Sequence, residues 1–288
     1  MWPIVGSIGG QPVYSYGLAV AVALGVCLAL AWGRRRAAGL ETGDLLNFVL
    51  LGIAALLFAP KIWAIVHTMD FGAAAWLGLL QFWRLGELSA GVVAAATALA
   101  WAVYAARRRI PLRPVLDAYL LVVLTGLAIQ RAGCFLAGCC YGTPTTMPWS
   151  VRFPAGSPAG DHFPGQALHP VQLYYATAYL LIAAGLWGLE AWRRRSGRPM
   201  PPGLTAGVGL LLAGAAHAGV SAFRADAAAA PIIWVAGLAA TAFGALLLGW
   251  SIRGARPKLA PAAARRSAGQ RRPTGVTGTP KRKSSLEG

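Results

Sequence analysis

Seven blocks of about 20 mostly apolar residues run along this chain of 288 residues, and they constrain its fold more than any other feature. A helix needs about 20 consecutive apolar residues to cross the hydrocarbon core of a bilayer. Because lipid offers the backbone no hydrogen-bond partner, such blocks fold as helices that satisfy their own backbone. We therefore expect an all-α polytopic membrane protein with about seven transmembrane helices. The blocks cover residues 14–32, 45–66, 88–106, 115–129, 171–192, 204–220 and 232–252.

The composition excludes several other classes of protein. Only 12% of the residues are charged and 57% are hydrophobic, whereas about 25% are charged in an ordinary soluble domain. This excludes a soluble globular enzyme, a disordered chain and a disulfide-stapled secreted domain. The shorter apolar stretch 71–82 is predicted to lie at the membrane interface or to re-enter the membrane. The net charge of +17 does not predict nucleic-acid binding, because the basic residues gather between the blocks and in the tail.

The distribution of basic residues predicts the orientation. With seven spans, one side receives 21 of the Lys and Arg residues and the other side receives 5. The positive-inside rule then places the N-terminus outside, in the periplasm of a bacterium, and the C-terminus in the cytoplasm. We expect a multi-pass membrane protein, with residues 1–256 as its transmembrane domain. Residues 257–288 are predicted to be a disordered basic cytoplasmic tail, because they have few large apolar side chains to bury.

The connection over residues 130–170 holds most of the unusual chemistry. It contains three cysteines, two histidines and two arginines among many Gly, Pro and aromatic residues. A loop of this length without a hydrophobic period is usually functional or disordered, and its composition favours an ordered, functional loop. Its arginines oppose the topology bias of the outer face. A lipid phosphate is the ligand that such cations are expected to bind.

Two sequence elements carry a resemblance to a known family. The stretch QRAGCFLAGCCYG over residues 130–142, followed by HPVQLY over residues 169–174, resembles the prolipoprotein diacylglyceryl transferase family. Tyr16-Gly17, Asp117 and Phe223-Arg224 add weaker matches, and the resemblance covers about residues 8–252. It implies an enzyme that transfers a diacylglyceryl group from phosphatidylglycerol to the lipobox cysteine thiol of prolipoproteins. Its partners would be phosphatidylglycerol, prolipoprotein signal peptides and the lipid bilayer, and it would need no cofactor. It would be a multi-pass protein of the bacterial inner membrane with its active face toward the periplasm.

The chain departs from the family pattern at several positions. Ala90 stands where the family usually has a histidine important to catalysis, and His217 stands where it usually has an arginine. Cys134 and Cys139 replace the usual Asn and Glu, and Lys61 replaces an Arg. These departures favour an alternative hypothesis. In that alternative the chain is a non-catalytic relative that binds phospholipid or lipoprotein without transfer.

The expected phosphate ligands are arginines and glycines. Arg131 is the first choice, because a guanidinium grips phosphate with two hydrogen bonds, and Arg152 and Arg224 are the second choices. Gly133 and Gly142 would let the backbone approach the head group closely. The alternative is that each arginine is an interfacial or snorkelling residue with a structural role.

The expected catalytic base is a histidine. His169 is preferred, since an imidazole titrates near neutrality and can accept a thiol proton. The alternative is a histidine held at a helix start by the proline that follows it. His217 is the other catalytic candidate, against the alternative of a histidine hydrogen-bonded between helices. Tyr16, Gln172 and Tyr174 are expected to donate hydrogen bonds to the head group, although an interfacial tyrosine is ordinarily only an anchor.

Three closely spaced cysteines leave their role open. Cys134, Cys139 and Cys140 could hold zinc together with His162 or His169, or two of them could form a disulfide outside the cytoplasm. Their spacing is not a standard zinc pattern, and adjacent cysteines seldom bind one metal well. We therefore expect no metal site and take small packing residues as the main interpretation.

Overall fold

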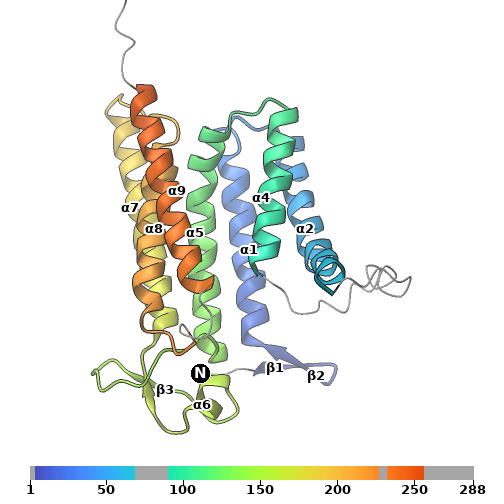
Figure 1. Cartoon of the computed structure of the whole chain (residues 1–288), viewed down its shortest axis with the longest axis vertical. Helices are drawn as coiled ribbons and strands as arrows, with labels where there is room; N and C mark the ends of the chain where they lie inside the picture. The colour runs from blue at the N-terminus through green and yellow to red at the C-terminus, as the bar shows by residue number, and fades with distance from the viewer. Residues whose placement is uncertain (1–3, 69–89, 227–231, 256–288) are drawn as a thin grey trace, which may run out of the picture. The chain divides into compact units, whose positions relative to one another are not determined.

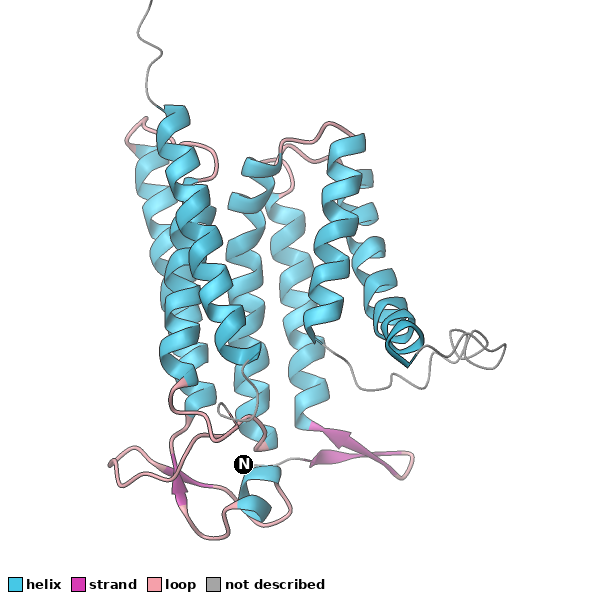
Figure 2. Ribbon diagram, in the orientation of Figure 1, coloured by secondary structure: helices cyan, strands magenta, loops and turns pink. Residues whose placement is uncertain are grey.

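The computed structural model describes residues 4–68, 90–226 and 232–255. Seven long α-helices lie within these residues, together with one short helix and four short strands (Figures 1 and 2). The long helices are α1 (Ser15–Arg34), α2 (Thr42–Thr68), α4 (Ala90–Arg107), α5 (Leu112–Ala137), α7 (Val171–Arg195), α8 (Leu204–Ser221) and α9 (Ile232–Ala255). The short elements are β1 (Ile4–Ile8), β2 (Gln11–Tyr14), β3 (Val151–Arg152), α6 (Pro158–His162) and β4 (Ala167–Leu168).

The helices have the character of membrane spans, which confirms the all-α polytopic class. Within the described residues, α1, α2, α5, α8 and α9 are long and apolar enough to cross a bilayer. Large apolar side chains point outward from them, including Leu24, Leu50 and Leu246. In water such exposure would be costly, whereas lipid makes it favourable. That all seven long helices span the membrane stays a prediction, and the segments 71–82 and 257–288 lie outside the described residues.

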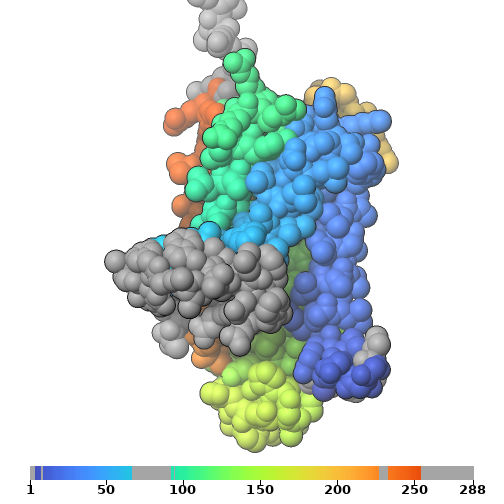
Figure 3. Space-filling view, turned by 90° about the vertical axis from the view of Figure 1, so that its right-hand side faces the viewer, coloured from blue at the N-terminus to red at the C-terminus, as the bar shows by residue number. Residues whose placement is uncertain are grey.

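Helix α5 is the centre of the bundle. It packs against α1 on one side and against α7 and α8 on the other (Figure 1). Helices α2 and α4 lie side by side (Figure 3), joined by a hydrogen bond of 2.8 Å from Trp101 Nε1 to the carbonyl of Phe48. Helices α8 and α9 approach closely through glycines, since a Cβ on Gly207 would lie 2.7 Å from the backbone nitrogen of Leu248. Such small-residue contacts join helices that have no hydrophobic drive in lipid.

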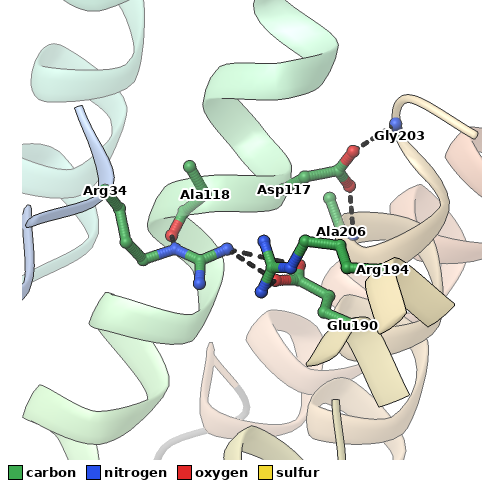
Figure 4. A network of polar contacts seen from close by, with 7 residues as sticks. All are labelled: Arg34, Asp117, Ala118, Glu190, Arg194, Gly203 and Ala206. Atoms are coloured by element: carbon green, nitrogen blue, oxygen red, sulfur yellow. Dashed lines mark hydrogen bonds and ion pairs between the residues drawn. The ribbon is translucent and has the colours of Figure 1, made fainter. Parts of the chain in front are cut away.

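A half-buried polar network joins four helices at the end of the bundle where α1 and α7 finish (Figure 4). The guanidinium of Arg34 donates to both carboxylate oxygens of Glu190, at 2.9 and 3.2 Å, and to the carbonyl of Ala118. Asp117 accepts from the backbone nitrogens of Gly203 and Ala206, at 2.6 and 2.7 Å. Asp117 therefore caps the start of α8 from the side of α5. This geometry gives the family-matched Asp117 a structural role.

Four of the long helices carry arginines in their last turn. They are α1, α4, α7 and α9, with Arg34, Arg107, Arg193 to Arg195, and Arg253. All four helices finish at the same end of the bundle (Figure 1). Cations at helix C-termini are stabilised by the negative end of the helix dipole. The basic clusters of the sequence are thus gathered at one end, opposite the loop that follows α5.

The structure corrects the predicted start of the long loop. The expected helix stopped at residue 129, but α5 continues for two further turns to Ala137. Gly138 ends it in the left-handed conformation with φ of 74°, which glycine adopts without steric cost. Most residues of this stretch are small, apolar or aromatic and continue the helix, which ends only at Gly138. Arg131 and Cys134 are therefore helical residues, and the loop proper begins at residue 138.

The connection after α5 is an ordered cap over one end of the bundle. Strands β3 and β4 pair within it, and Phe153, Ala159 and Leu168 form a small buried core. The antiparallel hairpin of β1 and β2, which the sequence analysis did not predict, lies at the same end. Figure 3 shows the loop in yellow-green and the hairpin in dark blue at the lower end of the molecule. Both elements lie opposite the basic helix ends.

Candidate functional site

Gly142 joins the two family-like elements at one point beside the ends of α7 and α8. A Cβ at this position would lie 2.5 Å from the carbonyl oxygen of His169 and 2.9 Å from that of Phe223. Only glycine fits such a close approach. Gly142 also pairs with Arg224 as an isolated β-bridge. The glycine therefore acts by bringing the segments of His169 and Arg224 together.

Arg131 and His217 lie on the same aromatic ring. The guanidinium carbon of Arg131 is 4.7 Å from the centroid of the Tyr175 ring, and the ring of His217 is 5.0 Å from it. Tyr175 is fully buried, and its hydroxyl lies 2.8 Å from Ser221 Oγ. His217 Nδ1 is also 2.7 Å from the hydroxyl of Tyr179. Helices α5, α7 and α8 thus each contribute a polar group to one cluster.

Arg131 keeps part of its hydrogen-bonding capacity unused. Its Nε is buried without a hydrogen-bond partner among the described residues. A buried donor without a partner is costly. Such a donor commonly marks the place where a ligand or water completes the network. An anionic oxygen is the partner that a guanidinium binds best.

Arg224 is a second buried cation in this region. Only 8% of it is exposed, and its guanidinium holds the carboxylate of Asp226 at 2.8 and 2.6 Å. The partner Asp226 is itself 51% exposed. Arg224 follows the end of α8 and is fixed by the bridge to Gly142. An incoming phosphate at this position would have to share the guanidinium with Asp226.

His169 belongs to an aromatic group at the start of α7. Its Nδ1 is 3.2 Å from the hydroxyl of Tyr174, which accepts a bond of 2.7 Å from Trp149 Nε1. The imidazole also lies 5.0 Å from the ring of Phe223. His169 is half-buried. These contacts orient the ring through Nδ1.

Gln172 and Tyr16 both bond to groups at the end of α5, Gln172 as a buried side chain and Tyr16 as an exposed one. Gln172 is fully buried and donates a bond of 2.8 Å to the carbonyl of Cys139, while its Oε1 has no hydrogen-bond partner among the described residues. The hydroxyl of Tyr16 accepts from Gln130 Nε2 at 3.2 Å, and the same nitrogen lies 3.3 Å from Cys134 Sγ. Both side chains therefore support the end of α5. Their predicted contact with a lipid head group stays a prediction.

Three cysteine sulfurs meet at this end of α5. The Sγ atoms of Cys134, Cys139 and Cys140 all lie within 4.8 Å of one another, and all three are free thiols. Hydrogen bonds from the other two thiols lower the pKa of Cys140, and the nearby charges of Arg224 and Arg131 act in the same direction. The trio is thus a polar cluster as well as a set of small packing residues.

Two of the predicted residues have other local roles. Arg152 is exposed, and its Nε donates to the carbonyl of Gly165 at 3.1 Å, a bond within the loop. A Cβ on Gly133 would collide with the Ala19 side chain, so this glycine permits the contact between α5 and α1. That either residue contacts substrate stays a prediction. Ala90 opens α4, and nothing further is described of its side chain.

The sequence analysis missed several members of this cluster. Tyr175, Tyr179 and Asp226 contact Arg131, His217 or Arg224 directly. Ser221 bonds to the hydroxyl of Tyr175. Two of them could have been found from helical spacing. Tyr175 and Tyr179 are four residues apart on α7 and so share one face. No local signal in the sequence indicates that this face meets α8.

The fold and this cluster define a polytopic membrane protein with a cationic, histidine-bearing candidate site at one end of its bundle. The family model of prolipoprotein diacylglyceryl transferase matches residues 3–250. The chain therefore belongs to that family, as the two sequence elements predicted.

Named relatives match over most of the chain. A phosphatidylglycerol–prolipoprotein diacylglyceryl transferase of Sinorhizobium medicae is 30% identical over 219 residues, covering 72% of this chain and 73% of the relative. One of Clostridium tetani is 26% identical, covering 69% and 78% respectively. One of Synechococcus elongatus is 25% identical over 253 residues and covers 86% of both chains. The similarity thus includes the bundle and the cap.

Proposed function

We propose that this protein transfers a diacylglyceryl group from phosphatidylglycerol to the lipobox cysteine thiol of prolipoproteins, at the periplasmic face of the bacterial inner membrane. The observation that carries the proposal is the meeting of Arg131 and His217 on the ring of Tyr175, with an arginine donor left unpaired. Membership of the family and the names of the relatives support the same reaction. The prolipoprotein signal peptide would approach the outer end of the bundle.

Arg131 has the role of phosphate ligand in this proposal. The acceptor sulfur forms a bond to the carbon of the diacylglyceryl group that carries the phosphate ester. The bond from that carbon to the phosphate oxygen breaks. The electron pair stays on the phosphate oxygen, so glycerol phosphate leaves with one more negative charge. A preorganised guanidinium in a low-dielectric site stabilises that developing charge. Arg224 would add a second positive charge when its guanidinium binds the phosphate as well as Asp226.

His169 has the role of base. In the neutral imidazole the ring proton would sit on Nδ1, and the Tyr174 oxygen at 3.2 Å would accept a hydrogen bond from it. Nε2 then has a free lone pair and takes the thiol proton. His217 supplies a hydrogen-bonding group where the family has an arginine.

Complementation tests the proposal. The chain is expressed in a bacterium depleted of its own transferase, and growth and lipoprotein maturation are followed. The purified protein is then assayed for transfer of labelled diacylglyceryl from phosphatidylglycerol to a lipobox peptide. Rescue and transfer support the proposal. Absence of both, with phosphatidylglycerol still bound, would favour the non-catalytic relative, for which Ala90 and His217 supply the sequence argument.

A further inference from the structure

The three-cysteine cluster at the end of α5 has the arrangement of a metal site. Cys134 lies in the last turn of α5 and is 1% exposed, while Cys139 and Cys140 follow the left-handed Gly138 and are half-buried. All three Sγ atoms lie within 4.8 Å of one another. Zinc–sulfur bonds of about 2.3 Å place the sulfurs of one tetrahedral site about 3.8 Å apart. Small side-chain rotations would therefore bring the three sulfurs to bonding distance of one ion.

A strained backbone allows the adjacent cysteines to share a ligand. Side chains of neighbouring residues in an extended chain point to opposite sides. Cys140 instead has φ of 54°, in the left-handed region, which is sterically unfavourable for a residue other than glycine. Gln172 anchors the segment, since its amide donates 2.8 Å to the carbonyl of Cys139. This local conformation lets the sulfurs of the adjacent residues Cys139 and Cys140 lie near one another and near Cys134.

The surroundings suit a thiolate cluster. Gln130 Nε2 lies 3.3 Å from Cys134 Sγ and can donate to a thiolate there, as groups around metal ligands commonly do. Arg131 lies one turn before Cys134 on α5, and Arg224 pairs with Gly142, two residues after Cys140. Three thiolates and one Zn²⁺ have a net charge of −1, which these arginines offset. Thiolate ligands favour zinc or cuprous copper over harder cations.

The coordination would be incomplete with protein ligands alone. Within the described part of the chain, no histidine or carboxylate joins the three sulfurs. Three protein ligands and one open position are the pattern of a catalytic zinc, whereas structural zinc sites are closed by four. A thiol that binds zinc loses its proton outright. The reaction proposed above needs such a thiolate.

We propose that Cys134, Cys139 and Cys140 bind one zinc ion, and that its fourth position takes the acceptor thiol of the prolipoprotein. The binding of the acceptor thiol at the fourth position rests on the proposed function. On binding, the acceptor S–H bond breaks and the proton passes to His169. The zinc-bound sulfur forms the S–C bond to the glyceryl carbon while the C–O bond to the phosphate breaks, and the electron pair leaves with the phosphate. The thioether product is a poorer ligand than the thiolate and dissociates.

The site is tested first by metal binding, which requires no transfer. The full chain is purified in detergent with a phosphine reductant, and its zinc content and Zn²⁺ affinity are measured with Cu⁺ in parallel. We expect one zinc per chain, and an affinity at least about 10-fold weaker in Cys134→Ser, Cys139→Ser and Cys140→Ser. Cys27→Ser is the matched control, because its thiol lies on α1 against the carbonyl of Val122. It should bind zinc as the wild type does.

Alkylation of the wild type gives a second measurement that needs no variant. Bound Zn²⁺ should protect the three cluster thiols from a maleimide, as mapped by mass spectrometry, and should leave Cys27 unaffected. Failure of the reduced wild type to bind zinc or to show this protection would overturn the site. A pair of thiols oxidised on isolation, with no zinc binding after reduction, would replace it with a disulfide. Binding of Cu⁺ alone would also overturn the zinc assignment.

The role of the fourth position is tested with Co²⁺ as a coloured substitute for zinc. Adding a lipobox peptide should shift the thiolate-to-cobalt absorption, whereas the same peptide with Cys→Ser should not. A bound metal with no shift would overturn the acceptor role and leave the metal site standing. If the shift occurs while transfer is absent, the metal proposal stands and the proposed transfer fails. The two failures are therefore distinguishable.

Discussion

The guanidinium of Arg131 lies 4.7 Å from the centre of the Tyr175 ring, which joins α5 to α7 inside the bundle. A cation over a desolvated aromatic ring is held by about 2 kcal/mol. The ring leaves the edge of the guanidinium free to bind an anion. His217 packs on the same ring at 5.0 Å. Tyr175 is therefore the residue that positions the principal cation of the candidate site.

Removing the charge of Arg131 tests the phosphate contact. Arg131→Ala should lower transfer by at least about 10²-fold, as expected for loss of a preorganised charge-stabilising group. Arg131→Lys should recover only part of the activity, because a lysine lacks the two-pronged grip. Transfer of labelled diacylglyceryl to a lipobox peptide is the measurement. Arg198→Ala, in the connection between α7 and α8, is the control, and full activity of the alanine variant at 131 would remove the proposed role.

Two substitutions at Tyr175 separate its ring from its hydroxyl. Tyr175→Phe keeps the ring under Arg131 and loses the bond to Ser221, so it should cost about 1 kcal/mol in stability with little loss of transfer. Tyr175→Leu also loses the cation–ring contact and should lower transfer by about 10-fold more than the phenylalanine variant. Thermal unfolding in detergent and the transfer assay are compared. Equal transfer in both variants would mean that the ring does not position Arg131.

The two histidines are separated by changing each to glutamine. His169→Gln should lower transfer by at least about 10²-fold, since general-base catalysis typically contributes about 10²–10⁴-fold. His217→Gln should cost less, because the amide can still bond to the hydroxyl of Tyr179. The pH profile of transfer is recorded for both variants. A modest loss in both would show that the thiolate forms without either imidazole and would remove the proposed role of His169 as base.

Asp117 offers a test of stability away from the site. Its carboxylate accepts from the backbone nitrogens of Gly203 and Ala206. Asp117→Ala should destabilise the protein by about 1–2 kcal/mol, the usual cost of losing a helix cap, and Asp117→Asn should cost less because one oxygen remains. The detergent unfolding midpoint reports the loss. Phosphatidylglycerol binding measured well below that midpoint should be unchanged, and loss of binding there would give Asp117 a functional role.

Reporter fusions test the orientation of the bundle. Gly197 follows the arginines that end α7, and Ser157 lies in the cap at the opposite end. The positive-inside rule places Gly197 in the cytoplasm and Ser157 in the periplasm. Fusions truncated at the two positions should therefore give opposite signals with a periplasm-dependent reporter. The same signal from both fusions would contradict the assignment.

The sequence predicted the family and the class of fold because both depend on local patterns. Apolar blocks of span length permit few structures other than helices in lipid, and the observed helices follow the predicted blocks closely. The error at α5 had a local cause, because the polar and small residues from Gln130 onward resemble a loop but retain helical geometry up to Gly138.

The tertiary structure alone decided which residues meet. Sequence spacing does not show that α7 and α8 face each other, so Tyr175 and Ser221 were not predicted. It also does not show that φ of 54° at Cys140 turns one sulfur toward two others. The sequence by itself thus determined the helices and the family, which follow from periodicity and motif. The contacts between Arg131, Tyr175 and His217, and those among the three cysteines, depend on how distant segments pack, because each needs partners that only folding brings within reach.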